Sequence, residues 1–373
     1  MDPLARHDML PDQTCEEKSR HEFLVDMKTW LMREGGPGVR RVYERRVAPA
    51  FAKKTGHAPR SRHEIAEAMK DEPYYQMWSA LSRAQQEIYV DSTAECVERQ
   101  LPELIGKYRR YRDRNTMGSL TLNPAIDMPH YQTSVDIHCV PGGYLAELGE
   151  DDVYAGARYD IGTWLFGRGL RGPYNDLRGV TGTRFIKERF ADFAPKRILD
   201  LGCATANNTL PYVDAFPGAD VYGVDISAGC LRYAHARAEA IGKAVHLSQQ
   251  RAEHTDFEDE SFDLVVSHIL FHETSRRAVF DFLKEAHRLL KPGGLTVHVD
   301  VGRHLSAKTP LDQFIADWDT LNNNEPFWGT VLFDMDMKEP ALAAGFKADD
   351  IHEELVDARM GDMDYWAYYA VKP

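Results

Sequence analysis

The chain has 373 residues and a mass of 42.4 kDa, a length more typical of two domains than of one. Apolar residues make up 43% and charged residues 28%, which excludes a wholly disordered chain and a collagen-like rod. The formal net charge is -13, and residues 186–373 hold most of it, with 31 acidic against 19 basic residues. Because an acidic surface repels phosphate backbones, we expect no nucleic-acid partner.

The sequence also indicates in which cellular compartment the protein is expected. No segment approaches the roughly 20 consecutive apolar residues that cross a membrane, and residues 1–20 lack the apolar core of a signal peptide. The five cysteines are scattered and form no CxxC pair, which is typical of reduced thiols. We therefore expect a cytoplasmic protein without a membrane span.

Residues 1–125 are predicted to form a mainly helical N-terminal domain. Between about 16 and 114, apolar residues recur at spacings of three and four, the period of a helix that buries one face. Ser61, followed three residues later by Glu64, predicts the N-terminus of one of these helices through a capping box. The chain contains no repeat of 20 to 50 residues, so a solenoid is not expected.

Residues 126–185 form the predicted connecting segment, which is rich in aromatic residues and glycines. Aromatic side chains with hydroxyl groups in such loops are typical of a ligand pocket, and a loop-rich core between domains is the alternative. His130, His138 and Cys139 fit no closed zinc pattern, so no metal is expected. The residues of this segment predicted to contact a substrate are Tyr144, Tyr159, Trp164 and Tyr174.

From residue 186 onward, short apolar strands alternate with helices. Strands are predicted at 197–202, 221–225, 245–249, 262–268 and 295–301, and helices at about 209–216, 227–241 and 276–290. This alternation predicts an α/β fold with a doubly wound, mostly parallel sheet. Ligands of such sheets bind beyond the carboxyl ends of the strands, where we expect Asp200, Gly202 and Asp225 to lie together.

The turn after the first of these strands does not suit a dinucleotide. Gly202 would have to be followed by glycines at the positions of Ala204 and Asn207. Asp200 has the wrong charge for a pyrophosphate and the right charge for an ammonium or sulfonium group. Asp225, at the end of the second strand, is placed to accept hydrogen bonds from ribose hydroxyls. Together these features describe a cationic nucleoside.

Motifs over residues 197–301 resemble those of a known family. They are Ile198-Leu-Asp-Leu-Gly-Cys-Ala204, Tyr222-Gly-Val-Asp-Ile-Ser227, Arg251-Ala-Glu253, Ser267-His-Ile-Leu-Phe-His-Glu273 and Leu289-Leu-Lys-Pro-Gly-Gly294. In this order and at this spacing they resemble the class I S-adenosylmethionine-dependent methyltransferases, nearest the small-molecule branch that includes the ubiquinone and menaquinone methyltransferases. The resemblance covers about residues 190–373.

The resemblance implies a seven-stranded Rossmann-like domain over 186–373, with S-adenosyl-L-methionine as its cofactor. It also implies methyl transfer to a small organic acceptor, enclosed between this domain and the N-terminal helices. A methyltransferase-fold protein that binds the nucleoside but performs another reaction, or a regulatory role, is the alternative. A homodimer is compatible with either function.

Carried over by position, Asp200 would orient the methionine amino group and Asp225 would bind the ribose hydroxyls. The cofactor-binding residues implied in this way are Asp200, Gly202, Cys203, Ala204, Asp225, Ile226, Arg251, Ala252, Glu253, Ser267 and His268. Two departures concern the cofactor loop and the adenine side. Ala204 and Ala206 replace glycines of the family, so a left-handed turn there costs strain. Arg251 replaces an acid.

A general base is needed only where the acceptor loses a proton early. His268, which follows the fourth strand, is the first candidate, and a hydrogen-bonded pocket histidine without proton transfer is the alternative. His272 and Glu273 lie one turn on and are further catalytic candidates, with helix capping or pocket lining as their alternative. Asp300, near the end of the fifth strand, is a predicted substrate contact.

Overall fold

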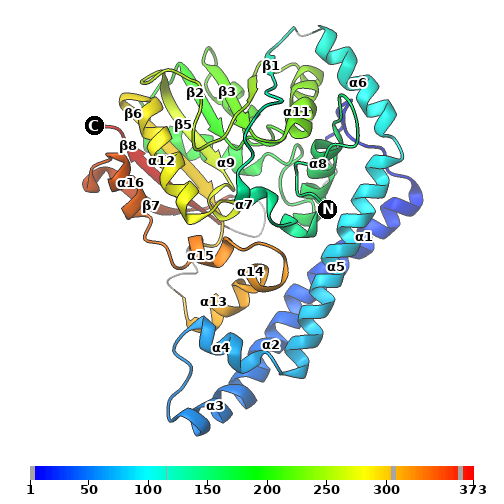
Figure 1. Cartoon of the computed structure of the whole chain (residues 1–373), viewed down its shortest axis with the longest axis vertical. Helices are drawn as coiled ribbons and strands as arrows, with labels where there is room; N and C mark the ends of the chain where they lie inside the picture. Colours follow the sequence, from blue (N-terminus) through cyan, green and yellow to red (C-terminus); the bar gives the residue numbers. More distant parts are fainter. Residues whose placement is uncertain (1–4, 115, 304–307, 360–363) are drawn as a thin grey trace.

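The computed structural model describes residues 5–114, 116–303, 308–359 and 364–373, and one eight-stranded sheet organises its C-terminal half (Figure 1). The strands are β1 (Ser119–Thr121), β2 (Arg197–Leu201), β3 (Asp220–Asp225), β4 (His246–Gln249), β5 (Phe262–His268), β6 (Leu290–Asp300), β7 (Ile351–Val356) and β8 (Tyr365–Val371). They lie in the order β1-β4-β3-β2-β5-β6-β8-β7. β8 pairs in antiparallel fashion with β6 and β7, and the other described pairings are parallel.

The predicted doubly wound, mostly parallel α/β sheet is confirmed. Each of the five strands located from the sequence is present, and β7 with β8 completes the seven strands that the resemblance implied. The eighth strand, β1, belongs to the region predicted to be helical. It pairs in parallel with β4, with Ser119 opposite His246, and so attaches the N-terminal half to the edge of the sheet.

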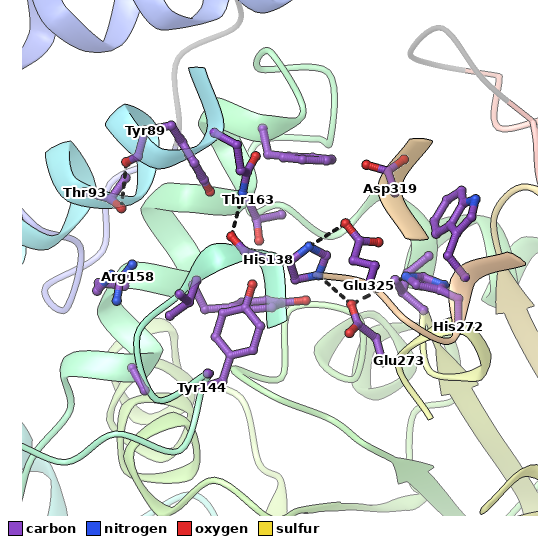
Figure 2. A pocket seen from close by; sticks show the side chains of 18 of the residues that line it. Tyr89, Thr93, His138, Tyr144, Arg158, Thr163, His272, Glu273, Asp319 and Glu325 are labelled. Atoms are coloured by element: carbon purple, nitrogen blue, oxygen red, sulfur yellow. Dashed lines mark hydrogen bonds and ion pairs between the residues drawn. The ribbon is translucent and has the colours of Figure 1, made fainter. Parts of the chain in front are cut away.

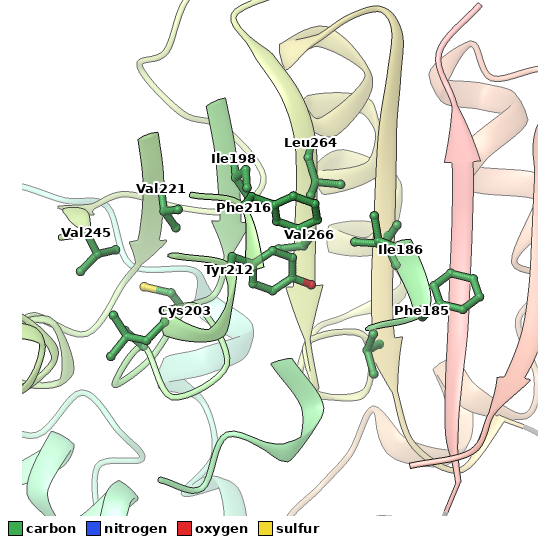
Figure 3. Close-up of a cluster of buried hydrophobic side chains, with 14 of the residues drawn as sticks. Phe185, Ile186, Ile198, Cys203, Tyr212, Phe216, Val221, Val245, Leu264 and Val266 are labelled. Atoms are coloured by element: carbon green, nitrogen blue, oxygen red, sulfur yellow. The ribbon is translucent and has the colours of Figure 1, made fainter. Parts of the chain in front are cut away.

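Helices cover both faces of the sheet because successive strand residues point to opposite sides. Ile198 packs into the cluster formed with α9 (Leu177–Arg189), α10 (Leu210–Ala215) and α11 (Ala228–Ile241), as Figure 3 shows. The next residue, Leu199, packs into the cluster of the opposite face, formed with α12 (Arg276–Leu289) and α16 (Lys338–Ala344). Both side chains are fully buried, which stabilises the fold by about 1.5–3 kcal/mol for each.

The N-terminal half is a layer of helices beside the sheet (Figure 1). They are α1 (Cys15–Trp30), α2 (Gly36–Val42), α3 (Ala48–Thr55), α4 (Arg62–Met69), α5 (Pro73–Glu98), α6 (Leu101–Arg114), α7 (His130–Thr133) and α8 (Tyr154–Phe166). Half of the capping box predicted for α4 is present, since the Ser61 side chain accepts a hydrogen bond from the backbone N–H of Glu64. The Glu64 carboxylate accepts its hydrogen bond from the Arg60 N–H, one residue before the predicted donor. Further helices after β6, α13 (Pro310–Ala316), α14 (Trp318–Asn322) and α15 (Trp328–Leu332), return the chain to this layer.

The buried carboxylate of Asp160 on α8 joins the two halves. It accepts hydrogen bonds from the Tyr233 hydroxyl of α11 at 2.9 Å and from the Asn207 amide at 3.1 Å. Burial alone would raise its pKa, but the Arg237 guanidinium and the hydrogen bond from His7 lower it. Asn207 lies in the loop after β2, so the N-terminal half helps to hold the loop on which a nucleoside would rest.

Within the described ranges, the structure contains no helix that is both long enough and apolar enough to cross a membrane. All five cysteines are free thiols.

Candidate active site at two adjoining cavities

A first cavity of about 130 Å³ lies beyond the carboxyl ends of the central strands, as predicted for a ligand of this sheet. We call it the nucleoside cavity. The sequence-predicted cofactor residues that line it are Gly202, Ala204, Asp225, Ile226, Ala252, Glu253 and His268. Residues separated by as many as 66 positions in the chain are thus brought to one place by the strand order.

The carboxylate of Asp225 holds the loop after β2. One of its oxygens accepts a hydrogen bond from the Ala204 N–H at 2.9 Å, and the other accepts one from the Ser227 N–H at 2.8 Å. Burial raises the pKa of Asp225, and these backbone donors oppose that rise. Each oxygen keeps a lone pair for a further donor, such as a ribose hydroxyl.

The loop turns through left-handed backbone conformations. Gly202 has a φ of 71°, and a Cβ there would lie 2.7 Å from a methyl carbon of Leu270. Ala204 and Ala206 have φ values of 46° and 56°, so the turn forms with alanines where the family has glycines. This conformation is strained for a residue with a Cβ, as the sequence predicts.

Four of the predicted cofactor residues lie behind the lining of the nucleoside cavity. Asp200 is 2% exposed and accepts a hydrogen bond from the Thr209 hydroxyl at 2.6 Å. Arg251 forms ion pairs with Asp127 at 3.5 Å and with Glu253 at 3.6 Å. The other two are Cys203 and Ser267, which are both buried. The cofactor roles of all four stay predictions.

His268 lines the nucleoside cavity, but both of its ring nitrogens have protein partners. Nδ1 lies 3.3 Å from an Asp200 carboxylate oxygen, and Nε2 lies 3.2 Å from the Tyr212 hydroxyl. A base must keep a free lone pair for the proton that it removes. The geometry therefore favours a histidine that positions Asp200, the alternative raised from the sequence, and its role as a base stays a prediction.

A second cavity of about 180 Å³ adjoins the first, and we call it the acceptor cavity. It lies between the sheet, α5, α8 and the segment after β6. Four residues line both cavities and form the wall that they share: Tyr144, Tyr159, Ile269 and Glu273. Tyr144 and Tyr159 were predicted as substrate contacts.

The other three predicted substrate contacts, Trp164, Tyr174 and Asp300, lie outside the described lining of both cavities. Asp300 is 1% exposed and accepts hydrogen bonds from the Phe271 N–H at 2.9 Å and from His272 Nδ1 at 2.6 Å. Its place is therefore beneath the loop that carries His272, and its contact with a substrate stays a prediction.

A network of charged groups runs along the wall of the acceptor cavity (Figure 2). His138 Nε2 lies 2.6 Å from a Glu273 carboxylate oxygen, and Nδ1 lies 2.8 Å from Glu325. Burial alone would lower the pKa of His138, but the two carboxylates raise it well above its ordinary value. Conversely, burial alone would raise the pKa of Glu273, and His138 with His272 lowers it.

His272 is also protonated at neutral pH. Burial would lower its pKa, but Asp300 and Glu273 together raise that pKa to about 10. The Nδ1 of His272 lies 2.6 Å from Asp300 and its Nε2 lies 3.5 Å from Glu273, so both ring nitrogens have carboxylate partners. A protonated imidazole takes up no proton, and the role of His272 in catalysis stays a prediction. No metal-binding group of three or more His, Cys, Asp or Glu side chains occurs among the described residues.

Several lining residues of the acceptor cavity were not predicted. Gln86, Tyr89 and Thr93 come from one face of α5, while Asp319, Glu325 and Trp328 come from α14, α15 and the loop between them. The spacing of the α5 residues, three and four, was the one signal for them, and it marks any helix face. The residues after β6 carry no motif.

Comparisons with known proteins identify the C-terminal half. Residues 198–294 match the family model described as a methyltransferase domain. The matched segment holds the loop after β2 and the end of β5, so the C-terminal half contains a methyltransferase domain. The predicted resemblance to class I S-adenosylmethionine-dependent methyltransferases is confirmed for this domain, and the match supports S-adenosyl-L-methionine as its cofactor.

Individual relatives cover only this domain. A demethylmenaquinone methyltransferase of Thermus thermophilus is 38% identical over 104 residues, which are 28% of this chain and 46% of the relative. A tRNA N(3)-methylcytidine methyltransferase of Drosophila melanogaster is 26% identical over 153 residues, 35% of this chain and 47% of the relative. The chain thus spans less than half the length of these curated relatives, and their acceptors differ.

Among solved structures, a phosphoethanolamine N-methyltransferase 2 of Haemonchus contortus, in complex with S-adenosyl-L-methionine, is similar with a TM-score of 0.42 and 17% identity. The similarity covers 57% of each chain.

Proposed function

We propose that this protein transfers a methyl group from S-adenosyl-L-methionine to a small organic acceptor enclosed between the sheet and the N-terminal helices. One observation carries the proposal: the nucleoside cavity and the acceptor cavity share a wall, formed by Tyr144, Tyr159, Ile269 and Glu273. A transferase that joins a nucleoside donor to a separate acceptor needs two such neighbouring spaces. A cavity walled by two layers of the fold suits a small molecule better than a polynucleotide.

The residues of the nucleoside cavity fit the proposed cofactor. Asp225 offers two carboxylate oxygens to ribose hydroxyls, and the apolar side chains of Ile226 and Ala252 offer contact to an adenine ring. Glu253, whose carboxylate accepts a hydrogen bond from the Tyr131 hydroxyl at 2.8 Å, lines the same side. When bound, the cofactor supplies an activated methyl group on a positively charged sulfur.

The chain itself contributes alignment, charge and the exclusion of water. An in-line displacement is accelerated chiefly by holding the two reactants in contact and in line. Glu273, ionised and present in the wall between the cavities, places a negative charge beside the proposed position of a cation. His272, which lies beside Glu273, helps to keep that carboxylate ionised, and His268 holds Asp200 in place.

Two measurements test the proposal. Calorimetry should show binding of S-adenosyl-L-methionine to the full-length chain, and incubation of the protein with a metabolite extract and a methyl-labelled donor should yield a labelled small molecule. A Glu273→Gln variant should bind S-adenosyl-L-methionine more weakly and yield less labelled product, because the negative charge beside the proposed cation is lost. Binding without any methylated product would support the alternative, a protein of this fold that binds the nucleoside without methylating.

A further inference from the structure

The acceptor cavity contains a buried guanidinium group that no carboxylate in the described part of the chain neutralises. Arg178, on α9, lines the cavity and is 8% exposed. None of the described residues accepts a hydrogen bond from Arg178 or forms an ion pair with it, and its Nε atom is buried without a partner. A guanidinium carries five N–H donors and a fixed positive charge, so its burial without acceptors destabilises the fold. An anionic ligand would supply both the acceptors and the charge.

Two further arginines line the acceptor cavity. Arg171 lines the same cavity, and burial together with the neighbouring charge of Arg178 lowers the pKa of Arg171. Arg158, on α8, also lines it and is 7% exposed. Its hydrogen bonds go to a tyrosine hydroxyl and a backbone carbonyl, both at 3.4 Å, and no described carboxylate pairs with it. Figure 2 shows Arg158 on the far side of His138 from His272.

The carboxyl groups of the lining do not offset these charges. Glu273 and Glu325 are both engaged by His138. Burial and the charge of Glu325 raise the pKa of Asp319 to about 7, so this group is ionised only in part at neutral pH. Of the two histidines in this wall, His138 is paired with Glu273 and Glu325, and His272 is paired with Asp300. These carboxylates are therefore engaged by the histidines and do not contact Arg178.

We propose that the acceptor is an organic anion whose carboxylate or phosphate group binds Arg178. That this anion is the methyl acceptor rests on the proposed function, whereas the binding of an anion to Arg178 does not. Arg178 lies close enough to Tyr159, a residue of the shared wall, for its charge to oppose the burial-driven rise of the Tyr159 pKa. An anion on Arg178 therefore lies near that wall, with the rest of the molecule free to extend along it.

The test uses the full-length protein and matched probes. Benzoate is compared with benzamide, and phenyl phosphate with phenol, by calorimetry and by thermal shift. We expect at least one anion to bind about tenfold or more tightly than its neutral counterpart, because a hydrogen bond between charged groups is worth about 1.5–3 kcal/mol. The two anions distinguish a carboxylate site from a phosphate site. Equal binding of anions and neutral counterparts, or no binding of either anion, would overturn the proposal.

Variants then assign the effect to Arg178. Arg178→Met should abolish the preference for the anion while its melting temperature, without ligand, stays equal to that of the parent or rises, because an unpaired buried charge is removed. Arg178→Lys, which keeps the charge, should retain part of the preference. The control is Arg277→Met, which changes an exposed arginine paired with Asp281 on the surface. It should alter neither the preference for the anion nor the melting temperature.

A structural role for Arg178 predicts the reverse result. Arg178→Met would then unfold or melt at a lower temperature. Arg178→Lys would either keep the full anion binding of the parent or show no anion binding at all. Binding of S-adenosyl-L-methionine is measured in parallel on each variant. If the cofactor fails to bind while the anion binds through Arg178, the proposed function fails and the anion site stands.

Discussion

Replacement of Asp225 tests the assignment of the nucleoside cavity most directly. In Asp225→Ala both carboxylate oxygens are lost, and with them the hydrogen bonds to the Ala204 and Ser227 N–H groups and the acceptors offered to a ribose. Each hydrogen bond from a ribose hydroxyl to the charged group is worth about 1.5–3 kcal/mol. Two of them amount to roughly 3–6 kcal/mol, so the Kd of S-adenosyl-L-methionine should rise by about 10²–10⁴-fold.

Asp225→Asn refines this test. Its amide keeps one oxygen acceptor, but its NH₂ group has to face one of the two backbone N–H donors at Ala204 and Ser227. Because two donors cannot bond to each other, we expect the asparagine variant to lose nearly as much affinity as the alanine variant. A variant that lost its cofactor only through general unfolding would also show a collapsed melting transition, so thermal unfolding is measured alongside.

The matched control is Asp220→Ala. Asp220 is an aspartate of the same strand, β3, but it lies exposed at the opposite end, away from the nucleoside cavity. Calorimetric titration of the three variants and the parent should show a weakened Kd only for changes at position 225. An Asp225→Ala protein that binds S-adenosyl-L-methionine within twofold of the parent would refute the assignment.

The parts of the site that local sequence could predict are those built from strand ends. Asp225 and the turn at Gly202 each follow a short apolar strand, and parallel strands bring their carboxyl ends to one edge. The sheet itself could be predicted for the same reason, since its strands and helices alternate at regular spacing. β1 was not predicted because its three residues are too few to show the alternation of apolar and polar residues that distinguishes a strand from a loop.

Residues placed by helical phase or by distant contacts could not be predicted in this way. Tyr159 and Thr163 line the acceptor cavity, whereas Trp164, one residue further on the same helix, lies about 100° round its axis and outside the lining. Composition alone predicted both Tyr159 and Trp164 as substrate contacts and could not distinguish between them.

The charged network illustrates the same limit over longer distances. His138 meets Glu273 and Glu325, which lie 135 and 187 positions further along the chain. No spacing rule links such groups, and a metal-site pattern was the only test that the sequence offered for His138. Arg178 could not be predicted either, because an arginine without a partner among the described residues cannot be recognised until its surroundings are known.

Three further predictions concern side chains around the two cavities. Since both ring nitrogens of His268 are engaged, His268→Gln should keep the methylation rate within tenfold of the parent, and a loss of more than a hundredfold would assign proton abstraction to it. Tyr89 lines the acceptor cavity and does not line the nucleoside cavity, so Tyr89→Ala should raise the KM of the acceptor and leave the Kd of the cofactor within twofold; an altered cofactor Kd would contradict this. The third concerns pH. Asp300 helps to raise the pKa of His272 from 6.5 to about 10, so the resulting stabilisation is complete below pH 6.5 and is lost as the pH rises through 10. Asp300→Asn should therefore lower the free energy of unfolding by about 3–5 kcal/mol near pH 6, and the deficit should shrink toward pH 10. Denaturant titrations of both proteins from pH 6 to pH 10 measure this difference, and a deficit that stays constant over that range would show that His272 is not held protonated by Asp300.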